Sequence, residues 1–213
     1  NLSDLCAITG LPRATAHRIA VALEKHRLIE RGADGAWVTG PALAEMAPST
    51  SSRLEDAAEF ILPDLMAKTG ESVQLYRLSG MERVCIANAE PATGLRDTVP
   101  VGHRMTLSAG SAAKLLVAYA PEAFQNQVLL DAAYTREDLE KIADEGIAES
   151  SAERDPSLAS ASVPVFGSDM PNRTVIASLS ISGPVARMGD HPAEKFGAEL
   201  KNSARLLEDL LRK

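Results

Sequence analysis

The sequence predicts an α+β protein in two parts, and three observations support this prediction. Residues 1–40 combine two short helical patterns with a strand hairpin, and residues 41–69 have helical periodicity. The remainder runs as a strand pair, helices, a second strand pair and a last helix, an order typical of a mostly antiparallel sheet covered by helices. With 213 residues, 45% of them apolar and 24% charged, the chain can bury one or two cores.

The first two helices are predicted from their end signals. Asn1 and Asp4 have the spacing of a capping box, and Gly10 can end that helix in a left-handed conformation. Pro12 suits the first turn of a second helix. The predicted core face of the second helix follows helical spacing: Ala16, Ile19, Ala20 and Leu23. Two short helices joined by a glycine turn predict a helix-turn-helix.

A hairpin follows, with strand-like runs at 28–31 and 36–39 around the turn-rich stretch Gly32-Ala33-Asp34-Gly35. A helix-turn-helix followed directly by a hairpin is a winged helix, predicted here for residues 1–40. Residues 41–52 are predicted as a linker helix, interrupted at its Ser/Thr-rich end at 48–52. The second domain is predicted to cover residues 53–213.

The second domain is predicted to mix strands and helices in alternation. Its strands are predicted at 72–79, 83–89, 94–102, 158–166 and 174–182, and its helices at 109–120, 135–145 and 192–212. The helix at 135–145 has a second capping box, formed by Thr135 and Asp138.

Charge and cysteine content restrict the class of function. The formal net charge is -7, but residues 1–40 carry five basic and four acidic side chains, against 17 basic and 25 acidic in the rest. We therefore expect any nucleic-acid contact near the N-terminus, where a local basic patch can act within a Debye length of about 8 Å. Cys6 and Cys85 are too few for a disulfide scaffold and indicate reduced thiols in a cytoplasmic compartment. No apolar run approaches the roughly 20 residues of a membrane span.

The solvent-facing side of the second helix carries the candidate DNA-binding residues. Arg13 and Arg18 can read guanine or hold phosphate in the major groove. Thr15 and His17 can add hydrogen bonds, and Arg31 on the wing can reach a flanking phosphate or the minor groove. The alternative is that these side chains are only solvated. The complete winged-helix pattern around them makes this alternative less favoured.

Three stretches resemble a known family in the order expected for it. Residues 10–18 (GLPRATAHR) resemble the recognition-helix motif of IclR-type bacterial transcriptional regulators. Residues 153–160 (ERDPSLAS) and 178–184 (SLSISGP) resemble two signature stretches of their effector domain. Residues 69–76 and 94–102 are similar to an actinobacterial branch that regulates amino-acid biosynthesis, including the leucine pathway.

The resemblance implies an architecture and a function. The winged helix and linker helix would be followed by a GAF-like domain that binds a small organic effector, and the first helix of the winged domain would precede Asn1. Such proteins act as homodimers or homotetramers on palindromic operators in double-stranded DNA. The branch implies a repressor of amino-acid (leucine) biosynthesis genes.

The resemblance also implies an effector site. It places Ser111 and Ala112 at the start of a helix, where free N–H groups suit a carboxylate or carbonyl oxygen. It places further polar groups on strands, at Ser150, Ser160, Ser180 and Ser182. Relatives that bind small oxo-acids have an acidic residue and a thiol in place of Ser150 and Ser160, so a keto-acid effector is not assumed. Apolar wall could come from three residues that otherwise belong to the core: Met105, Leu107 and Leu158.

Other classes of function find little support. An S-x-x-K motif at Ser111–Lys114 and a K-T-G motif at Lys68–Gly70 occur in the reverse of their order in serine β-lactamases, so no catalytic residue is predicted. The four histidines lack a metal-ligand spacing, and no cofactor is expected. The remaining alternative is a small-molecule sensor module that acts through protein contacts. Salt-dependent binding to duplex DNA would separate it from a regulator.

Overall fold

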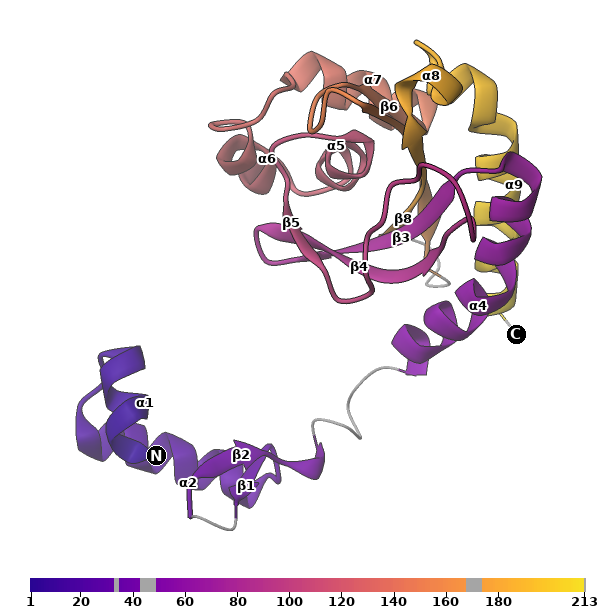
Figure 1. Ribbon diagram of the computed structural model, residues 1–213. Helices are drawn as coiled ribbons and strands as arrows, with labels where there is room; N and C mark the ends of the chain where they lie inside the picture. The colour runs from indigo at the N-terminus through magenta and orange to yellow at the C-terminus, as the bar shows by residue number, and fades with distance from the viewer. Residues whose placement is uncertain (33–34, 43–48, 168–173, 213) are drawn as a thin grey trace. The chain divides into compact units, whose positions relative to one another are not determined.

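The structure is a computed structural model that describes residues 1–32, 35–42, 49–167 and 174–212. The chain divides into two compact units, Asn1–Ser52 and Arg53–Lys213. Both contain helices and antiparallel strands, as the α+β prediction requires. Figure 1 labels the elements, and each unit is described by itself below.

The first unit contains the predicted helix-turn-helix and hairpin. Its elements are α1 (Leu2–Thr9), α2 (Arg13–Lys25), β1 (Ile29–Arg31) and β2 (Trp37–Thr39). The capping box is confirmed, because the Asn1 side chain accepts from the backbone N–H groups of Ser3 (2.8 Å) and Asp4 (3.1 Å). Gly10 ends α1 in the left-handed region with φ of 68°.

The core face of α2 is narrower than predicted. Ala16 and Ala20 are fully buried and Leu23 is half-buried, but Ile19 is 44% exposed, so its assignment to the core was wrong. At 100° per residue, Ile19 lies about 80° from the midpoint between Ala16 and Ala20 on the helix surface. The two alanines form a narrow stripe of small side chains, and Ile19 lies at its margin.

The hairpin is antiparallel, with Ile29 opposite Thr39 and Arg31 opposite Trp37. Gly40 follows β2 and donates its N–H to the Leu28 carbonyl at 2.9 Å. A Cβ at Gly40 would lie 2.2 Å from the Arg27 carbonyl oxygen, so this close approach requires glycine. Ala33 and Asp34, at the predicted tip, lie outside the described residues.

The helix α4 spans Ser49–Thr69. The predicted interruption at 48–52 is therefore wrong from Ser49 onward, because Ser49–Ser52 belong to the first turn of this helix. Serine and threonine are unfavourable inside helices but favoured at helix starts, which explains the composition. Residues 43–48 of the predicted linker helix lie outside the described residues.

The second unit is built on one antiparallel sheet with the strand order β5-β4-β3-β8-β7-β6. The strands are β3 (Ser72–Ser79), β4 (Glu82–Ala89), β5 (Arg104–Thr106), β6 (Ala148–Ser151), β7 (Leu158–Phe166) and β8 (Val175–Pro184). The helices after α4 are α5 (Ser111–Ala118), α6 (Glu122–Val128), α7 (Arg136–Glu145), α8 (Val185–Met188) and α9 (Pro192–Leu211). The capping box of Thr135 and Asp138 at the start of α7 is confirmed.

The strand predicted at 94–102 is wrong, because this segment is a loop and the short strand β5 comes after it. Gly94 and Gly102 have φ of 91° and 86°, in the left-handed region. Pro100 lacks the N–H that a ladder needs. The sequence did not predict β5, β6, α6 or α8, all short elements.

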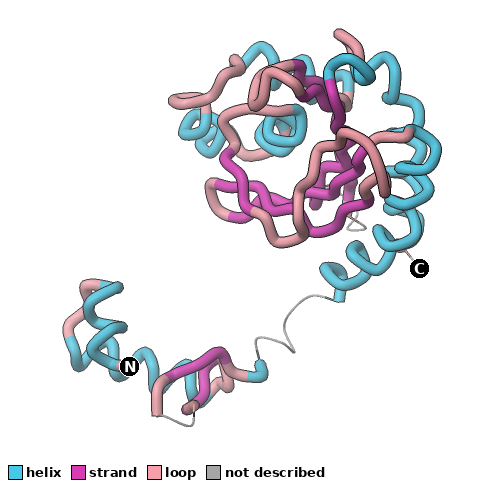
Figure 2. Tube along the Cα trace, in the orientation of Figure 1, coloured by secondary structure: helices cyan, strands magenta, loops and turns pink. Residues whose placement is uncertain are grey.

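Helices cover both faces of this sheet. Figures 1 and 2 show α4 and α9 together on one face and α5 to α7 on the other. Strand alternation assigns side chains to these faces. In β8, Ala177, Leu179 and Ile181 join the core with α4 and α9. The intervening serines of β8 therefore face the side on which α5 lies.

Candidate ligand pocket and nucleic-acid interface

A pocket lies between the sheet of the second unit and the start of α5. All six residues of the predicted effector site line it: Ser111, Ala112, Ser150, Ser160, Ser180 and Ser182. Its free volume is about 30 Å³, which is room for about two water molecules. Leu158 lines it too, whereas Leu107 belongs to the core around α5 and α7.

The strand residues of the pocket are neighbours across the sheet. Ser160 pairs in register with Ser150 on one side and with Ser182 on the other. Ser180 lies opposite both Ser162 and Gln74. Because neighbouring strands place paired residues on the same face, these side chains form two polar rows directed at α5.

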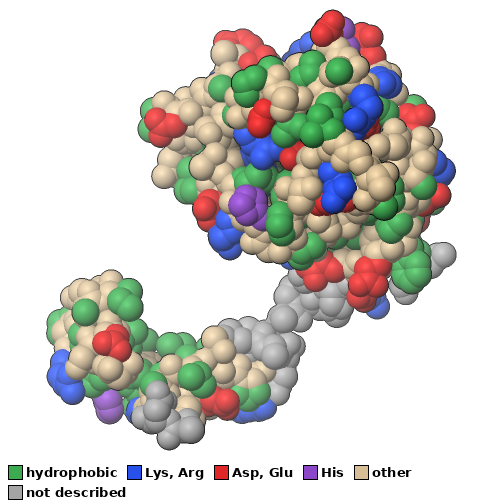
Figure 3. All heavy atoms as spheres, in the orientation of Figure 1, with side chains coloured by type: hydrophobic (Ala, Val, Ile, Leu, Met, Phe, Trp, Pro, Cys, Tyr) green, Lys and Arg blue, Asp and Glu red, His purple; other side chains and the backbone are tan. Residues whose placement is uncertain are grey.

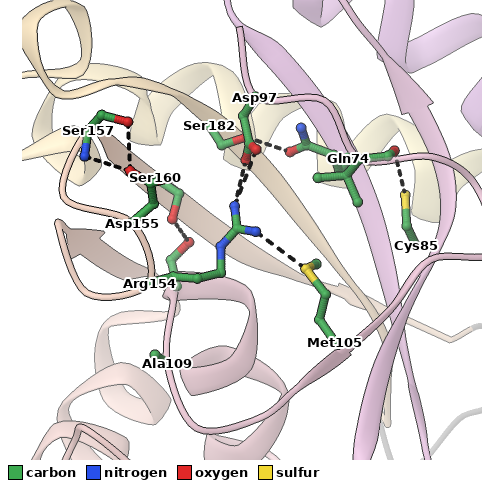
Figure 4. Close-up of polar contacts among 12 residues, drawn as sticks. Gln74, Cys85, Asp97, Met105, Ala109, Arg154, Asp155, Ser157, Ser160 and Ser182 are labelled. Carbon is green, nitrogen blue, oxygen red and sulfur yellow. Dashed lines mark hydrogen bonds and ion pairs between the residues drawn. The ribbon is translucent and has the colours of Figure 1, made fainter.

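Hydrogen bonds join the two rows to α5. The Ser111 hydroxyl contacts the hydroxyls of Ser160 and Ser162, each at 2.7 Å, and Ser162 contacts Ser180 at 2.6 Å. Ser182 donates to Gln74 Oε1 at 2.9 Å, as Figure 4 shows. Most of these hydroxyls are buried, so the network fixes their positions and leaves a compact polar surface.

The amino end of α5 already has one carboxylate beside it. Gly110 precedes the helix and donates its N–H to Glu153 Oε2 at 3.1 Å. Glu153 also pairs with Lys114, which donates to the Glu149 carbonyl at 2.9 Å. The next N–H groups of the first turn, at Ser111 and Ala112, have no partner within an α-helix and are available to a ligand.

Sequence reasoning missed several pocket residues. These are Gln74, Tyr76, Arg83, Asp97, Arg154 and Asp155. Arg154 donates from Nη2 to both carboxylate oxygens of Asp97, at 3.2 and 3.0 Å, and from Nη1 to Met105 Sδ at 3.6 Å (Figure 4). This ion pair joins the loop after β4 to the loop after β6. Asp97 lies in the stretch 94–102 and Arg154 in the stretch 153–160, two of the stretches that carry the resemblance. Gln74 and Tyr76 lie in another of them, residues 69–76, and this membership was the available signal.

Burial shifts the pKa values of two groups around the pocket without changing their charge at neutral pH. Desolvation raises the pKa of Tyr76 far above its usual value, so its hydroxyl stays protonated. Desolvation also lowers the pKa of Arg83. An arginine keeps its proton at neutral pH even so, because its ordinary pKa is above 12. Arg83 is therefore a permanent cation in this wall.

The predicted DNA-binding residues of α2 lie on its surface. Arg13, His17 and Arg18 are exposed, and Thr15 is half-buried. Arg13 Nη1 lies 3.5 Å from the Ser3 hydroxyl, and neither arginine has an ion pair with any residue that the structure describes. Figure 3 shows Lys or Arg and His side chains at the surface of this unit. Among the residues that the structure describes, no carboxylate neutralises Arg13 or Arg18, so these two charges can meet an anionic partner.

Arg31 differs from the residues of α2. Its guanidinium lies over the Trp37 ring, 4.2 Å from the centroid, and Nη1 donates to the Gly35 carbonyl at 3.0 Å. Its Nε lies 3.5 Å from Glu24, and the same carboxylate accepts from Trp37 Nε1 at 3.2 Å. These contacts join the wing to α2, so part of the donor capacity of Arg31 is used inside the unit.

A helix-turn-helix with a wing, followed by a sheet domain with a polar pocket, defines the class of ligand-responsive transcriptional regulators. Residues 47–208 match the profile described as the bacterial transcriptional regulator IclR C-terminal domain, and residues 1–33 match the IclR helix-turn-helix domain. The chain therefore belongs to the IclR family of transcriptional regulators. No helix among the described residues is long and apolar enough to cross a bilayer.

Individual relatives agree with this assignment. The chain is 27% identical to the HTH-type regulator KipR of Bacillus subtilis, over 95% of this chain and 86% of that protein. It is 26% identical to the repressor IclR of Escherichia coli, over 96% of this chain and 80% of that protein. A solved IclR-family structure from Rhodococcus sp. superposes with a TM-score of 0.68 at 26% identity, covering 99% of this chain and 85% of that one. An IclR homologue from Microbacterium hydrocarbonoxydans, complexed with 4-hydroxybenzoate, gives a TM-score of 0.67 at 23% identity, covering 100% of this chain and 91% of that one.

Proposed function

We propose that this protein is a cytoplasmic repressor of amino-acid biosynthesis genes, those of the leucine pathway included. It binds a palindromic operator as a homodimer or homotetramer and responds to a small organic effector in the pocket at α5. The observation that carries the proposal is the meeting of all six expected effector residues in one pocket of a chain that also exposes a basic α2. The similarity of residues 69–76 and 94–102 to the amino-acid branch supports the choice of genes.

DNA recognition is assigned to α2 and the wing. Arg13 and Arg18 supply forked cationic donors for guanine edges or phosphates, and Thr15 and His17 add hydrogen bonds in the same groove. Arg31 is assigned to contacts between the wing and the DNA backbone. It would use the guanidinium N–H groups that do not contact Glu24 or Gly35. The acidic remainder of the chain limits non-specific attraction to DNA.

The response to effector follows from the geometry of a palindrome. Half-sites on one face of DNA recur about every 34–36 Å, so two copies of α2 must keep that spacing to bind together. An effector shifts this arrangement only as far as its affinities for the DNA-competent and other forms differ. The complex of a relative with 4-hydroxybenzoate supports a small organic effector here as well.

The DNA-binding part is tested by fluorescence anisotropy with duplexes from upstream of amino-acid biosynthesis genes. Arg13→Ala and Arg18→Ala should each weaken specific binding by about 1–3 kcal/mol. If the side chain holds a phosphate, the slope of log K against the logarithm of the salt concentration should also fall in magnitude by about one. Arg104→Ala, an exposed arginine of β5, is the control and should bind as the parent does. Unchanged affinity in both α2 variants would contradict the proposed interface.

The effector part is tested by a thermal-shift screen of amino acids and their precursor acids with the full chain. A true ligand at 100 times its dissociation constant adds about 2.7 kcal/mol to the free energy of unfolding. A ligand that shifts the melting temperature should also change the affinity for operator DNA. A ligand that stabilises the protein without any effect on DNA affinity would contradict its role as effector.

A second candidate function is a sensor module that acts through protein contacts. It is favoured by the exposure of Ile8, Ile19 and Val21 in the first unit, at 84%, 44% and 46%. Salt dependence separates the two candidates. DNA binding that falls steeply with salt supports the regulator, and no binding to any duplex by the full-length oligomer supports the sensor.

A further inference from the structure

The loop between β4 and β5, residues 90–102, reaches across the sheet. Its residue Asp97 pairs with Arg154, which follows the edge strand β6. Between β4 and β6 in the strand order lie β3, β8 and β7, so the loop passes the ends of these strands to reach its partner. Asp97 and Arg154 both line the pocket at α5. The β4–β5 loop, drawn without helix or strand in Figure 1, therefore forms one wall of that pocket.

The pocket has no room for an organic ligand while its walls stay in this arrangement. Its free volume is about 30 Å³, whereas sites for drug-sized ligands enclose about 300–1,000 Å³. A wall must therefore move before a ligand can bind. The strands are held by ladders of backbone hydrogen bonds, and α5 is anchored by the fully buried Leu115 and Val117. Displacing either of these walls disrupts the core of the unit.

The β4–β5 loop is held in a different way. In the described part of the chain, residues 91–99 make no hydrogen bond between two backbone groups. Glu90 braces the loop from within, because its carboxylate accepts from Arg96 Nε at 3.3 Å, from the Thr98 hydroxyl at 3.1 Å and from the Val99 N–H at 3.2 Å. The loop is thus a compact segment that can move without breaking a ladder.

Two arginines from other elements fasten this loop. Arg187 of α8 donates to the Leu95 carbonyl at 2.7 Å. Arg154 donates to both carboxylate oxygens of Asp97, and Figure 4 shows its side chain extending between Asp97 and Met105. Only the second fastening lies in the pocket wall. The Arg154 side chain is 40% exposed, so water can replace its partner at modest cost.

We propose that residues 90–102 are a lid that opens and closes over the pocket at α5, that the Arg154–Asp97 ion pair is its latch, and that opening admits the ligand. This inference rests on the proposed function of the pocket and adds how access to it is controlled. Arg154 and Asp97 are positioning residues, because they set the population of the closed form. A ligand shifts that population as far as its affinities for the open and closed forms differ.

Cys85 is a natural reporter of this opening. Its thiol is fully buried and lies 3.7 Å from the carbonyl oxygen of Val99 in the lid. It packs in one cluster with Val99 and with Ala112 and Leu116 of α5. A thiol reagent cannot reach it while the lid is closed. When closing is faster than labelling, the labelling rate of Cys85 measures the population of the open form.

The test follows labelling of Cys85 by iodoacetamide in a Cys6→Ser background, by mass spectrometry of the full chain. Asp97→Asn and Arg154→Gln should each label roughly 10-fold or more faster than the background, as expected for the loss of hydrogen bonds between charged groups. Arg154→Lys keeps the charge and loses the planar fork, so its rate should fall between. An unchanged rate in the Asp97 and Arg154 variants overturns the inference.

The control is Arg212→Gln, which removes an exposed arginine that pairs with Asp209 at the end of α9. It should label as the background does, and an equal acceleration in this variant overturns the assignment of the latch. The Arg154 variants carry the test if Asp97→Asn does not fold, because the substituted side chain reaches solvent.

Two measurements separate lid opening from unfolding. Opening exposes little surface, so the labelling rate should stay nearly constant in urea below the unfolding transition. A rate that rises with urea as steeply as global unfolding overturns the inference. The double variant Asp97→Asn with Arg154→Gln should label no faster than the faster single variant, because both changes break the same pair. Effects that multiply overturn the latch.

Labelling requires neither effector nor DNA, so its outcome is independent of the proposed function. Operator binding is measured on the same preparations. Operator binding with unchanged labelling refutes the lid alone, whereas faster labelling in a protein that binds no operator supports the lid and refutes the proposed function.

Discussion

The two cysteines differ in their exposure to solvent. Cys85 is fully buried in β4, and its thiol lies 3.4 Å from the Ala87 carbonyl. Burial raises the pKa of Cys85 to about 12. Cys6, in α1, is half-buried. The thiolate is the reactive form, and the buried thiol of Cys85 neither ionises readily nor meets a reagent. Only Cys6 can therefore react in the native protein.

We therefore predict that Ellman's reagent at pH 8 titrates one thiol per native chain and two after unfolding. Cys6→Ser should remove the native reaction, and Cys85→Ser should leave it intact. Two thiols reacting at the same fast rate in the native protein would contradict the burial of Cys85.

His191 gives a pH-dependent contribution to stability. Its Nδ1 lies 3.3 Å from Glu149 Oε1, and this hydrogen bond, with the charge of Glu149, raises the pKa of His191. A raised folded-state pKa stabilises the protein below the unfolded value of about 6.5, and the contribution disappears as pH rises through the folded pKa. The imidazole is 66% exposed, so the contribution is small.

The prediction for His191→Ala is a lower melting temperature at pH 5.5 and no change at pH 8.5. His103→Ala is the control, because exposed His103 makes no ion pair in the part of the chain described here. A loss of stability at pH 8.5 equal to that at pH 5.5 would show that packing, rather than charge, accounts for the effect.

The structure places Ser111, Ser160 and Ser182 at one pocket, and their role in effector binding stays a prediction. Ser111, Ser160 and Ser182 came from motif resemblance, which fixes a place in the chain but no contact. Arg83 and Gln74 were missed because their place in the pocket depends on what surrounds them, a property of strand register and helix packing.

At the scale of elements, the end of β8 depends on a glycine. Glu71 is 3% exposed and holds Arg187 through two hydrogen bonds, of 2.6 and 2.8 Å. A Cβ at Gly183 would lie 2.2 Å from Glu71 Oε2. Any larger residue at this position must displace the Glu71 carboxylate from Arg187. The ion pair of these two residues joins the start of β3 to α8.

Gly183→Ala should therefore lower the free energy of unfolding by about 1–3 kcal/mol, the usual cost of overpacking. Ser178→Ala in the same strand is the control: its hydroxyl is buried without a partner among the described residues, so its removal should be neutral or stabilising. Chemical denaturation measures both. A Gly183→Ala protein as stable as its parent would show that Glu71 can move at no cost.

Elements were predictable where their signals are local. The caps at Asn1 and Thr135 need only four consecutive residues, and both were confirmed. The strand expected at 94–102 failed because its apolar alternation is overridden by two left-handed glycines and a proline. The strand β6 was missed because Ala148–Ser151 is too short and polar to stand out, and it exists by pairing with β7.

For the whole molecule, the proposed function joins two sites that lie in different compact units. If an effector changes operator affinity by some factor, operator DNA must change effector affinity by the same factor. We predict this reciprocity, with a factor of roughly 5–150. It is measured by titrating effector with and without saturating operator duplex.

A scrambled duplex of equal length is the control, since it carries the same charge without the sequence. Equal effector affinity with operator, scrambled duplex and no DNA would mean that the two units act independently. The expected boundary after residue 52 came from the Ser/Thr-rich stretch at 48–52. Coupling between the two units could not be predicted from the sequence. It depends on the free-energy difference between two conformations, whereas a sequence pattern indicates a single fold.

The alternation within β7 and β8 gives the two faces of the same strands different structural roles. The aliphatic side chains on one face hold α4 and α9, whereas the hydroxyl-bearing side chains on the other face shape the cavity. Exchanging one serine for alanine, threonine or cysteine alters the cavity and leaves the opposite face intact. If the pocket binds the proposed effector, its specificity can therefore be changed one serine at a time, while the face that packs against α4 and α9 is kept.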